Sequence, residues 1–585
     1  MAVEKLITDH IDIWSSALQT RSMAGRGSNG KIDLYGMKKL RELILELAVR
    51  GKLVPQDPND EPASELLKRI AVEKAELVKQ GKIKKQKPLL RISEDEKPFE
   101  LPEGWEWITL SEIATINPKI EVTDDEQEIS FVPMPCISTR FDGAHDQEIK
   151  KWGEVKKGYT HFADGDIALA KITSCFENSK TVIFKGLKGG VGVGTTELHV
   201  ARPISSELNL QYILLNIKSP HYLSMGESMM TGSAGQKRVP RSFFENYPIP
   251  FPPNTEQARI VGTFSKLMFL CDQLEQQSLT SLDAHQQLVE TLLATLTDSQ
   301  NAEELAENWA RISQHFDTLF TTEASIDALK QTILQLAVMG KLVSQDPNDE
   351  PASELLKRIE QEKVQQIKEG KIKKKKPLPS VSDDEKPFEL PQGGEWCRLP
   401  DLGELARGKS KHRPRNDPAL YVDGNFPLVQ TGDVSRSNGS IKTFTALYNE
   451  LGVKQSRIWP KGTLCITIAA NIADSGMLEF DACFPDSVVV YSPYITDIPV
   501  KYFDFFMRTM KSSLEKYAPS TAQKNINLDI LSQVFVPCPP LNEFGRIVCK
   551  VEILFSLLDT LKSRLQSAQQ TQLHLADALT DAALN

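Results

Sequence analysis

The chain has 585 residues, 40% hydrophobic and 25% charged, so it is too long for one ordinary domain and is not broadly disordered. Its formal net charge of −9 means that any contact with nucleic acid has to come from local basic clusters. Eight cysteines and nine histidines are dispersed without a C-x-x-C pair, which predicts reduced thiols and no metal site. The lack of a secretory leader or a long apolar stretch predicts a cytoplasmic protein without membrane contact.

A block near the start of the chain is repeated in its second half. Residues 47–70 return as residues 336–359 with 22 of 24 positions identical, at an offset of 289. The same offset continues to residues 97–102, which return as 386–391. Two copies of this size are too long for a solenoid repeat, so the chain is predicted to contain one module twice.

Short helices are expected inside these shared blocks. The pattern predicts helices over residues 37–49 and 326–338, each followed by a glycine that can end it. A further helix opens at Pro62, with Ser64 as its expected cap.

Lysine-rich runs follow these helices at residues 79–88 and 368–377. Such runs are typical of solvated linkers, but their repetition also fits contact with DNA phosphates or an acidic partner. Both interpretations stay open.

The middles of the two copies have little sequence in common. They contain short β-type runs flanked by glycine, aspartate and proline, at residues 165–170, 181–184, 464–468 and 488–491. They are therefore predicted to be mixed α/β domains.

A second pair of shared blocks, at an offset of 287, precedes two long helical patterns. Residues 250–253 and 537–540 are proline-rich, and apolar residues then recur at helical spacing over 260–296 and 547–579. Helices of about 40 residues with matching apolar stripes are expected to pair as an antiparallel coiled coil or bundle. The alternative is that each helix covers only its own domain.

Catalytic motifs are mostly absent. Residues 403–410 match G-x-x-x-x-G-K-S, but prolines follow where a phosphate-binding loop needs a helix, so we do not expect ATP binding there. The glycine-rich residues 189–194 lack a following helix pattern and are interpreted as a flexible loop. No Asn/Asp-Pro-Pro-Tyr/Phe tetrad of an amino-methyltransferase occurs. The chain is more simply a binding protein than an enzyme.

Basic and amide-rich clusters are the candidate DNA-binding sites. Arginine and lysine can bind phosphates or guanine edges, and glutamine and asparagine can pair with adenine. Two of the clusters precede the proline-rich blocks at matching places in the two copies. The candidates are Lys171, Gln236, Lys237, Arg238, Arg241, Arg407, Lys409, Lys411, Arg413, Arg415, Gln523, Lys524 and Asn525. Each cluster alone is typical of an ordinary loop, and their matched placement favours DNA contact.

Residues 29–63, which include Gly-Lys-Leu-Val-Pro-Gln-Asp-Pro-Asn-Asp-Glu-Pro-Ala, resemble the specificity subunit of type I restriction–modification systems, in particular its longer, type IB-like subgroup. Lys-Pro-Phe-Glu-Leu-Pro-Glu-Gly-Trp-Glu-Trp, at residues 97–107, resembles the start of the first target-recognition domain. The second copy reads Gln-Gly-Gly-Glu-Trp at residues 392–396 and lacks the first tryptophan. The resemblance covers essentially the whole chain.

The resemblance implies a non-catalytic subunit with two α/β target-recognition domains in pseudo-two-fold repeat, an α+β fold. Each domain reads half of a split DNA target, and paired helices fix their separation. The implied partners are double-stranded DNA, two modification (methyltransferase) subunits and two restriction (translocase and nuclease) subunits. S-adenosylmethionine, ATP and Mg²⁺ are expected to act in those partners, with no cofactor in this chain.

The division that follows has five parts: a helical repeat with basic linker over 1–102, recognition domains over 103–250 and 392–538, a central spacer with the second helical repeat over 251–391, and a C-terminal spacer over 539–585. Two rival functions stay open. One is a nucleotide-dependent DNA enzyme, and the other is a coiled-coil scaffold that binds proteins.

Overall fold

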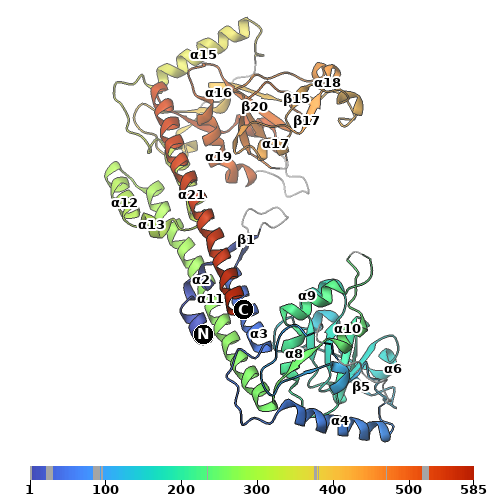
Figure 1. Ribbon diagram of the computed structural model, residues 1–585. Coiled ribbons are helices and arrows are strands. Elements are labelled where there is room, and N and C mark those ends of the chain that lie inside the picture. Colours follow the sequence, from blue (N-terminus) through green and yellow to red (C-terminus); the bar gives the residue numbers. More distant parts are fainter. Residues whose placement is uncertain are drawn as a thin grey trace. The chain divides into compact units, whose positions relative to one another are not determined.

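The computed structural model describes residues 3–21, 31–83, 92–93, 97–233, 235–374, 378–379, 381–469, 471–516 and 526–584. The chain divides into two compact units (Figure 1). Unit 1 comprises Met1–Ser281 and Ala568–Asn585, and unit 2 comprises Leu282–Ser567. Each unit contains one recognition domain and one copy of the shared helical blocks, while the five-part division stays a prediction.

Unit 1 combines short helices with small sheets. Its helices are α1 (Val3–Thr8), α2 (Ile11–Ser16), α3 (Tyr35–Val49), α4 (Ala63–Lys79), α5 (Leu110–Ile113), α6 (Trp152–Val155), α7 (Thr173–Glu177), α8 (Leu210–Ile217), α9 (Pro220–Ser228), α10 (Arg241–Asn246) and the first part of α11 (Asn254–Asp298). Its strands are β1 (Gln19–Arg21), β2 (Lys31–Asp33), β3 (Glu106–Ile108), β4 (Ala114–Ile116), β5 (Glu128–Val132), β6 (Glu148–Lys151), β7 (Thr160–Ala163), β8 (Ile167–Ala170), β9 (Thr181–Ile183), β10 (Val191–Gly194), β11 (Leu198–Pro203) and β12 (Ile249–Phe251).

Unit 2 repeats this plan with different loops. Its helices are α12 (Ala302–Gln314), α13 (Phe316–Leu319), α14 (Glu323–Val338), α15 (Ala352–Lys368), α16 (Leu399–Leu402), α17 (Thr431–Ser435), α18 (Glu450–Lys454), α19 (Val500–Lys516), α20 (Leu528–Ser532) and the first part of α21 (Leu541–Leu584). Its strands are β13 (Glu395–Arg398), β14 (Gly403–Arg407), β15 (Phe426–Leu428), β16 (Gly439–Ile441), β17 (Ala446–Tyr448), β18 (Leu464–Thr467), β19 (Ser475–Leu478), β20 (Val488–Pro493) and β21 (Phe535–Cys538).

One sheet of each recognition domain has the same strand order over its first four strands. One sheet has the order β4-β11-β8-β9 in unit 1, and its counterpart in unit 2 has the order β14-β20-β18-β19-β16. A two-stranded sheet joins the start of each domain to its end, pairing Trp107 with Pro250 and Trp396 with Pro537. These strands belong to the shared Pro-rich blocks. The divergent middle of each copy is therefore inserted between two strands that are common to both copies. The four predicted β-type runs are confirmed as β8, β9, β18 and β20.

The two long helices occur as predicted, with 45 residues in α11 and 44 in α21. Unit 1 holds the start of α11 and the end of α21, and unit 2 holds the reverse. This is the arrangement of an antiparallel pair. In unit 2, Leu293 of α11 and Leu558 of α21 lie in one buried apolar cluster with Ile333 of α14.

The shared short helices hold both long helices in matching ways. In unit 1, Arg41 of α3 bonds Asp272 of α11 at 2.6 Å, and Lys330 of α14 bonds the corresponding Asp559 of α21 in unit 2. Lys52 donates to the backbone oxygen of Leu584, near the end of α21, at 2.8 Å. Its counterpart Lys341 donates to Thr297 near the end of α11 at 3.0 Å. A lysine there satisfies carbonyls that lack helical partners.

The predicted cap of the helix after Pro62 is wrong. Helix α4 begins at Ala63, so Ser64 lies inside the first turn and Pro62 occupies the cap position without a side-chain bond. The Ala63 backbone N–H instead donates to the Gly104 carbonyl at 2.9 Å, and Ala352 donates to Gly393 in the same way at 2.8 Å. A tertiary contact has replaced the local cap.

Candidate nucleic-acid interface

In unit 1, one end of the β4-β11-β8-β9 sheet gathers the candidate residues of that domain. Lys171 directly follows β8, and its backbone N–H donates to the Glu197 carbonyl just before β11 at 2.9 Å. Val239 N–H donates back to the Lys171 carbonyl at 2.9 Å. Lys171 and the loop that carries Gln236, Lys237 and Arg238 are therefore adjacent, although 65 residues of sequence separate Lys171 from Gln236.

Arg238 is already paired at this sheet end. Its Nε and Nη2 donate to the two carboxylate oxygens of Glu197, each at 2.8 Å. Side-chain hydrogen bonding from Arg238 lowers the pKa of Glu197. Gln236 and Lys237 are exposed beside this pair, and Arg241 pairs with Glu245 on α10.

In unit 2 the corresponding loop returns to the sheet at the matching place. Ile526 N–H donates to the Ile468 carbonyl at 2.9 Å, the counterpart of the bond between Val239 and Lys171. Ile468 directly follows β18, as Lys171 follows β8. Gln523, Lys524 and Asn525 lie outside the described residues.

The basic segment of residues 407–415 begins at this same end of the unit 2 sheet. Arg407 is the last residue of β14, and Gly408 N–H donates to the Val488 carbonyl, where β20 starts, at 2.9 Å. The segment therefore lies beside Ile468 and Ile526.

Asp486 organises the arginines of this segment. Arg415 forms an ion pair with its carboxylate, Arg413 lies 3.7 Å from it, and Arg407 Nε donates to its backbone oxygen. Lys409 and Lys411 are exposed between these arginines. Both lysines present their charge to solvent, as phosphate binding requires.

Sequence reasoning missed the acids and amides of these sheet ends. Glu197 and Asp486 each lie just before the equivalent strand, β11 or β20, and each holds an arginine. Asn471, which follows β18, is exposed and donates to Ser435 Oγ at 2.9 Å. Nearby, Lys511 of α19 bonds Asp474. In the sequence, the only sign of these partners was an acid just before a strand. That sign does not predict an arginine partner unless the strand pairing is known.

Two stretches of the chain, residues 102–284 and 391–570, match the family model described as the type I restriction modification DNA specificity domain. The chain belongs to this family. Each stretch covers one recognition domain and the first part of the long helix that follows it. The resemblance to specificity subunits and the tandem arrangement of two recognition domains are thereby confirmed.

Curated relatives cover the chain from end to end. It is 73% identical over 599 residues to the type I restriction enzyme EcoEI specificity subunit and 61% identical over 599 residues to the EcoAI specificity subunit, both of Escherichia coli, with 100% of each chain covered. A solved structure described as showing complex assembly and conformational transition of the type I R-M system matches with a TM-score of 0.50 and 16% identity, over 83% of this chain and 99% of that one. At that identity the likeness supports the fold.

Membership of the family identifies the chain as a DNA-recognition subunit and not as the catalytic one. The phosphate-loop match also fails structurally, because Gly403–Arg407 is strand β14 and no helix follows Lys409 directly. Within the described part of the chain, no three His, Cys, Asp or Glu side chains gather as metal ligands. None of the described helices is long and apolar enough to cross a membrane.

Proposed function

We propose that each recognition domain reads one half of a split DNA target with the sheet end described above. The observation that carries this proposal is that Val239 and Ile526, which directly follow the two basic, amide-rich sequences, bond the same sheet end in both units. These bonds join Val239 to Lys171 and Ile526 to Ile468. The bound molecule is double-stranded host DNA in the cytoplasm.

The residue types suggest a division of roles. Gln236, Gln523 and Asn525 have the amide groups that pair bidentately with adenine, and Arg238, when released from Glu197, has the guanidinium that pairs with guanine. The lysines at 171, 237, 409, 411 and 524 and the remaining arginines of the candidate set bind phosphates and fix the register.

Substitution in the two matched loops tests this assignment. We expect Arg238→Ala and Lys524→Ala each to weaken binding of the target about tenfold, because each removes one cationic contact. Lys461→Ala is the matched control, since Lys461 precedes β18 at the opposite end of the strand. The target comes from methylome sequencing of a host that carries this chain, and binding is measured at low salt with the modification subunits present. Neutral results for both variants would remove these loops from the interface.

The long helices are proposed to set the gap between the half-sites. Half-sites on one face of DNA lie about 34–36 Å apart, a distance that roughly 23 helical residues span. We expect one heptad inserted between Leu274 and Leu292, with a matching heptad between Leu561 and Leu579, to lengthen the gap by about three base pairs. An unchanged gap in the methylation footprint of this variant would contradict the proposal that helix length sets the gap.

The same helices are proposed to dock two modification subunits, one on each unit. Leu270 and Leu575 are 50% and 41% exposed in unit 1, and their counterparts Leu557 and Leu288 are 63% and 50% exposed in unit 2. Exposed leucines at repeated positions fit two copies of one partner.

We expect Leu270→Asp or Leu557→Asp to reduce the number of bound modification subunits from two to one, as counted by native mass spectrometry. Leu279→Asp is the control, because Leu279 is 40% exposed but has Gln566 at the corresponding position. Retention of two subunits by both variants contradicts this docking surface. The modification subunits supply S-adenosylmethionine-dependent adenine methylation, and two restriction subunits supply ATP- and Mg²⁺-dependent translocation and cleavage. No cofactor is assigned to this chain.

A further inference from the structure

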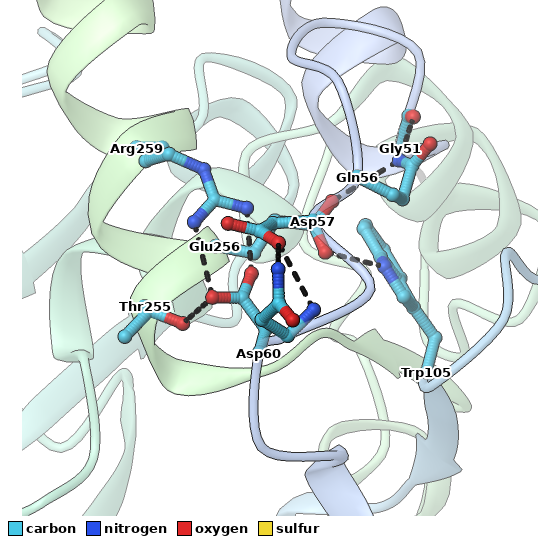
Figure 2. Close-up of polar contacts among 9 residues, drawn as sticks. Gly51, Gln56, Asp57, Asp60, Trp105, Thr255, Glu256 and Arg259 are labelled. Carbon is cyan, nitrogen blue, oxygen red and sulfur yellow. Dashed lines mark hydrogen bonds and ion pairs between the residues drawn. The ribbon is translucent and has the colours of Figure 1, made fainter.

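A polar junction joins each recognition domain to the long helix that leaves it. In unit 1, Arg259, in the second turn of α11, donates to Asp60 Oδ2 at 2.6 Å, and Thr255 Oγ1 donates to Oδ1 at 2.5 Å (Figure 2). Gln56 donates to Glu256 at 3.1 Å, and the Trp105 indole donates to the other oxygen of that carboxylate at 3.1 Å. Helix α11 is thus held by side chains from two earlier segments.

The same junction recurs in unit 2. Arg546 donates to Asp349 at 2.6 Å, Asn542 donates to Asp349 at 3.0 Å, and Gln345 donates to Glu543 at 3.1 Å. Asn542 replaces Thr255, and Gly394 stands at the repeat offset from Trp105. The ion pairs therefore persist in both modules even where the indole contact is missing.

The junction gives the long helix a second attachment to its recognition domain. The covalent attachment runs from β12 through Pro252 and Pro253 into α11. The second runs through Asp60, three residues before α4, which is itself fixed to the domain.

Three kinds of contact fix α4. Lys74 donates to the Ser111 carbonyl at 2.6 Å, Arg69 pairs with Glu207 at 3.0 Å, and the apolar face of α4 lies in the core of the domain. Phe264 of α11 adds an apolar contact, with its ring 5.4 Å from that of Phe141 in the same domain, so the polar junction and this contact together fix the direction of the helix.

The angle matters because the helix is long. The 45 residues of α11 span roughly 67 Å. A rotation of about 3° at its start displaces its far end by about 3.4 Å, the rise of one base pair. Loss of the ion pair also leaves the Asp60 side chain, only 9% exposed, without its cationic partner.

We propose that Asp60–Arg259 and Asp349–Arg546 are positioning pairs that restrict the protein to one gap length between half-sites. This inference rests on the proposed bipartite reading of DNA. The pairs touch no DNA in this proposal and act by fixing the direction of α11 and α21.

The test measures gap selectivity in the complex of the full chain with its modification subunits. Duplexes carry the methylome-derived target with the natural gap or with one base pair added or removed. We expect Arg259→Gln and Arg546→Gln each to lower the affinity ratio of natural over altered gaps at least about fivefold. Arg259→Lys, which keeps the charge, restores most of the ratio. Lys68→Gln, which breaks a pair with Glu65 within α4, leaves it at the wild-type value.

The affinity ratio separates positioning from stability, because each ratio compares two duplexes on one protein. An unchanged ratio in both glutamine variants overturns the proposal. If those variants fail to fold, Asp60→Asn and Asp349→Asn remove the ion pairs at nearly unchanged side-chain size, and an unchanged ratio in both overturns the proposal equally. A wild-type complex without target selectivity refutes the proposed function and this inference together. A selective wild type with unaffected variants refutes the inference alone.

Discussion

The two recognition domains present the same sheet end with different charges. In unit 1 the arginine of the loop, Arg238, is held bidentately by Glu197. In unit 2 three arginines share Asp486, with Lys409 and Lys411 exposed beside them. The backbone bonds made by Val239 and Ile526 are alike, whereas the charged side chains described at the two sheet ends are not. A common scaffold with divergent loops is how one module can read two different sequences.

The interiors of the two units also differ at one matched place. In unit 1 the Tyr247 ring packs against Tyr222 at 4.8 Å and Phe243 at 5.1 Å. The counterpart in unit 2 is Val534, which lines a largely apolar cavity of about 720 Å³ together with Met339. Met339 stands where unit 1 has Arg50, one of the two differences in the 24-residue repeat. The Tyr247 ring thus packs against two aromatic rings in unit 1, whereas the smaller Val534 borders a pocket in unit 2.

Removal of the Tyr247 ring is expected to have the largest effect on stability. We expect Tyr247→Ala to cost about 3 kcal/mol in the free energy of unfolding of unit 1, because it removes a packed aromatic ring. The matched variant Val534→Ala is expected to cost about 1 kcal/mol, since Val534 already borders empty space. Native-state hydrogen exchange, resolved to peptides of each unit, measures both values. Equal costs in the two units would show that the cavity is closed in solution.

A buried lysine distinguishes the pH dependence of the two units. Lys218 is 2% exposed, donates to the Ser179 carbonyl at 2.6 Å, and has its pKa lowered to about 7 by burial. The unfolded chain then holds more protons between pH 7 and 10, so the free energy of unfolding rises with pH in that window. Lys218 stands six residues after Tyr212 in unit 1. Arg508 stands six residues after Tyr502 in unit 2 and pairs with buried Asp504 at 3.0 Å.

We expect Lys218→Met to stabilise unit 1 relative to the wild type at pH 6 and to lose about 2 kcal/mol of that advantage by pH 9. Urea unfolding across this range measures the difference, with Lys461→Met as the exposed control. A pH-independent difference would mean that Lys218 titrates at its ordinary pKa in the folded chain.

Removal of the exposed lysines of unit 2 is expected to have the smallest free-energy effect of the three sets of substitutions. We expect Lys409→Ala with Lys411→Ala to weaken DNA binding about tenfold and to lower the salt slope by about two, because two phosphate contacts are lost.

Glu197→Gln tests unit 1 in the opposite direction, since it frees Arg238 for DNA and is expected to strengthen non-specific binding. Binding titrations at several salt concentrations measure both, and an unchanged salt slope in the double variant would exclude these lysines from the interface.

Sequence patterns predicted the repeated elements well and the local details less well. The helix predicted over 37–49 is confirmed as α3, and both long helices are confirmed, because apolar periodicity and flanking glycine or proline mark such elements. The flexible loop expected over residues 189–194 was wrong, since Val191–Gly194 is strand β10 between β5 and β7. A Cβ on Gly192 would lie 2.5 Å from the Phe162 ring, and one on Gly194 would lie still closer to the Val132 backbone oxygen, so these glycines make room for tertiary neighbours.

The duplication, the alternation of shared and divergent segments, and the long amphipathic helices could be predicted from the residues alone, because repetition and periodicity are properties of the order of residues. Which distant residues contact one another became visible in the folded chain. In the fold, Lys171 lies beside the loop of residues 236–239, Arg238 pairs with Glu197, and Asp60 pairs with Arg259, which is 199 positions away in the sequence. Contacts of this kind depend on strand pairing and packing between distant segments, and no local pattern records them.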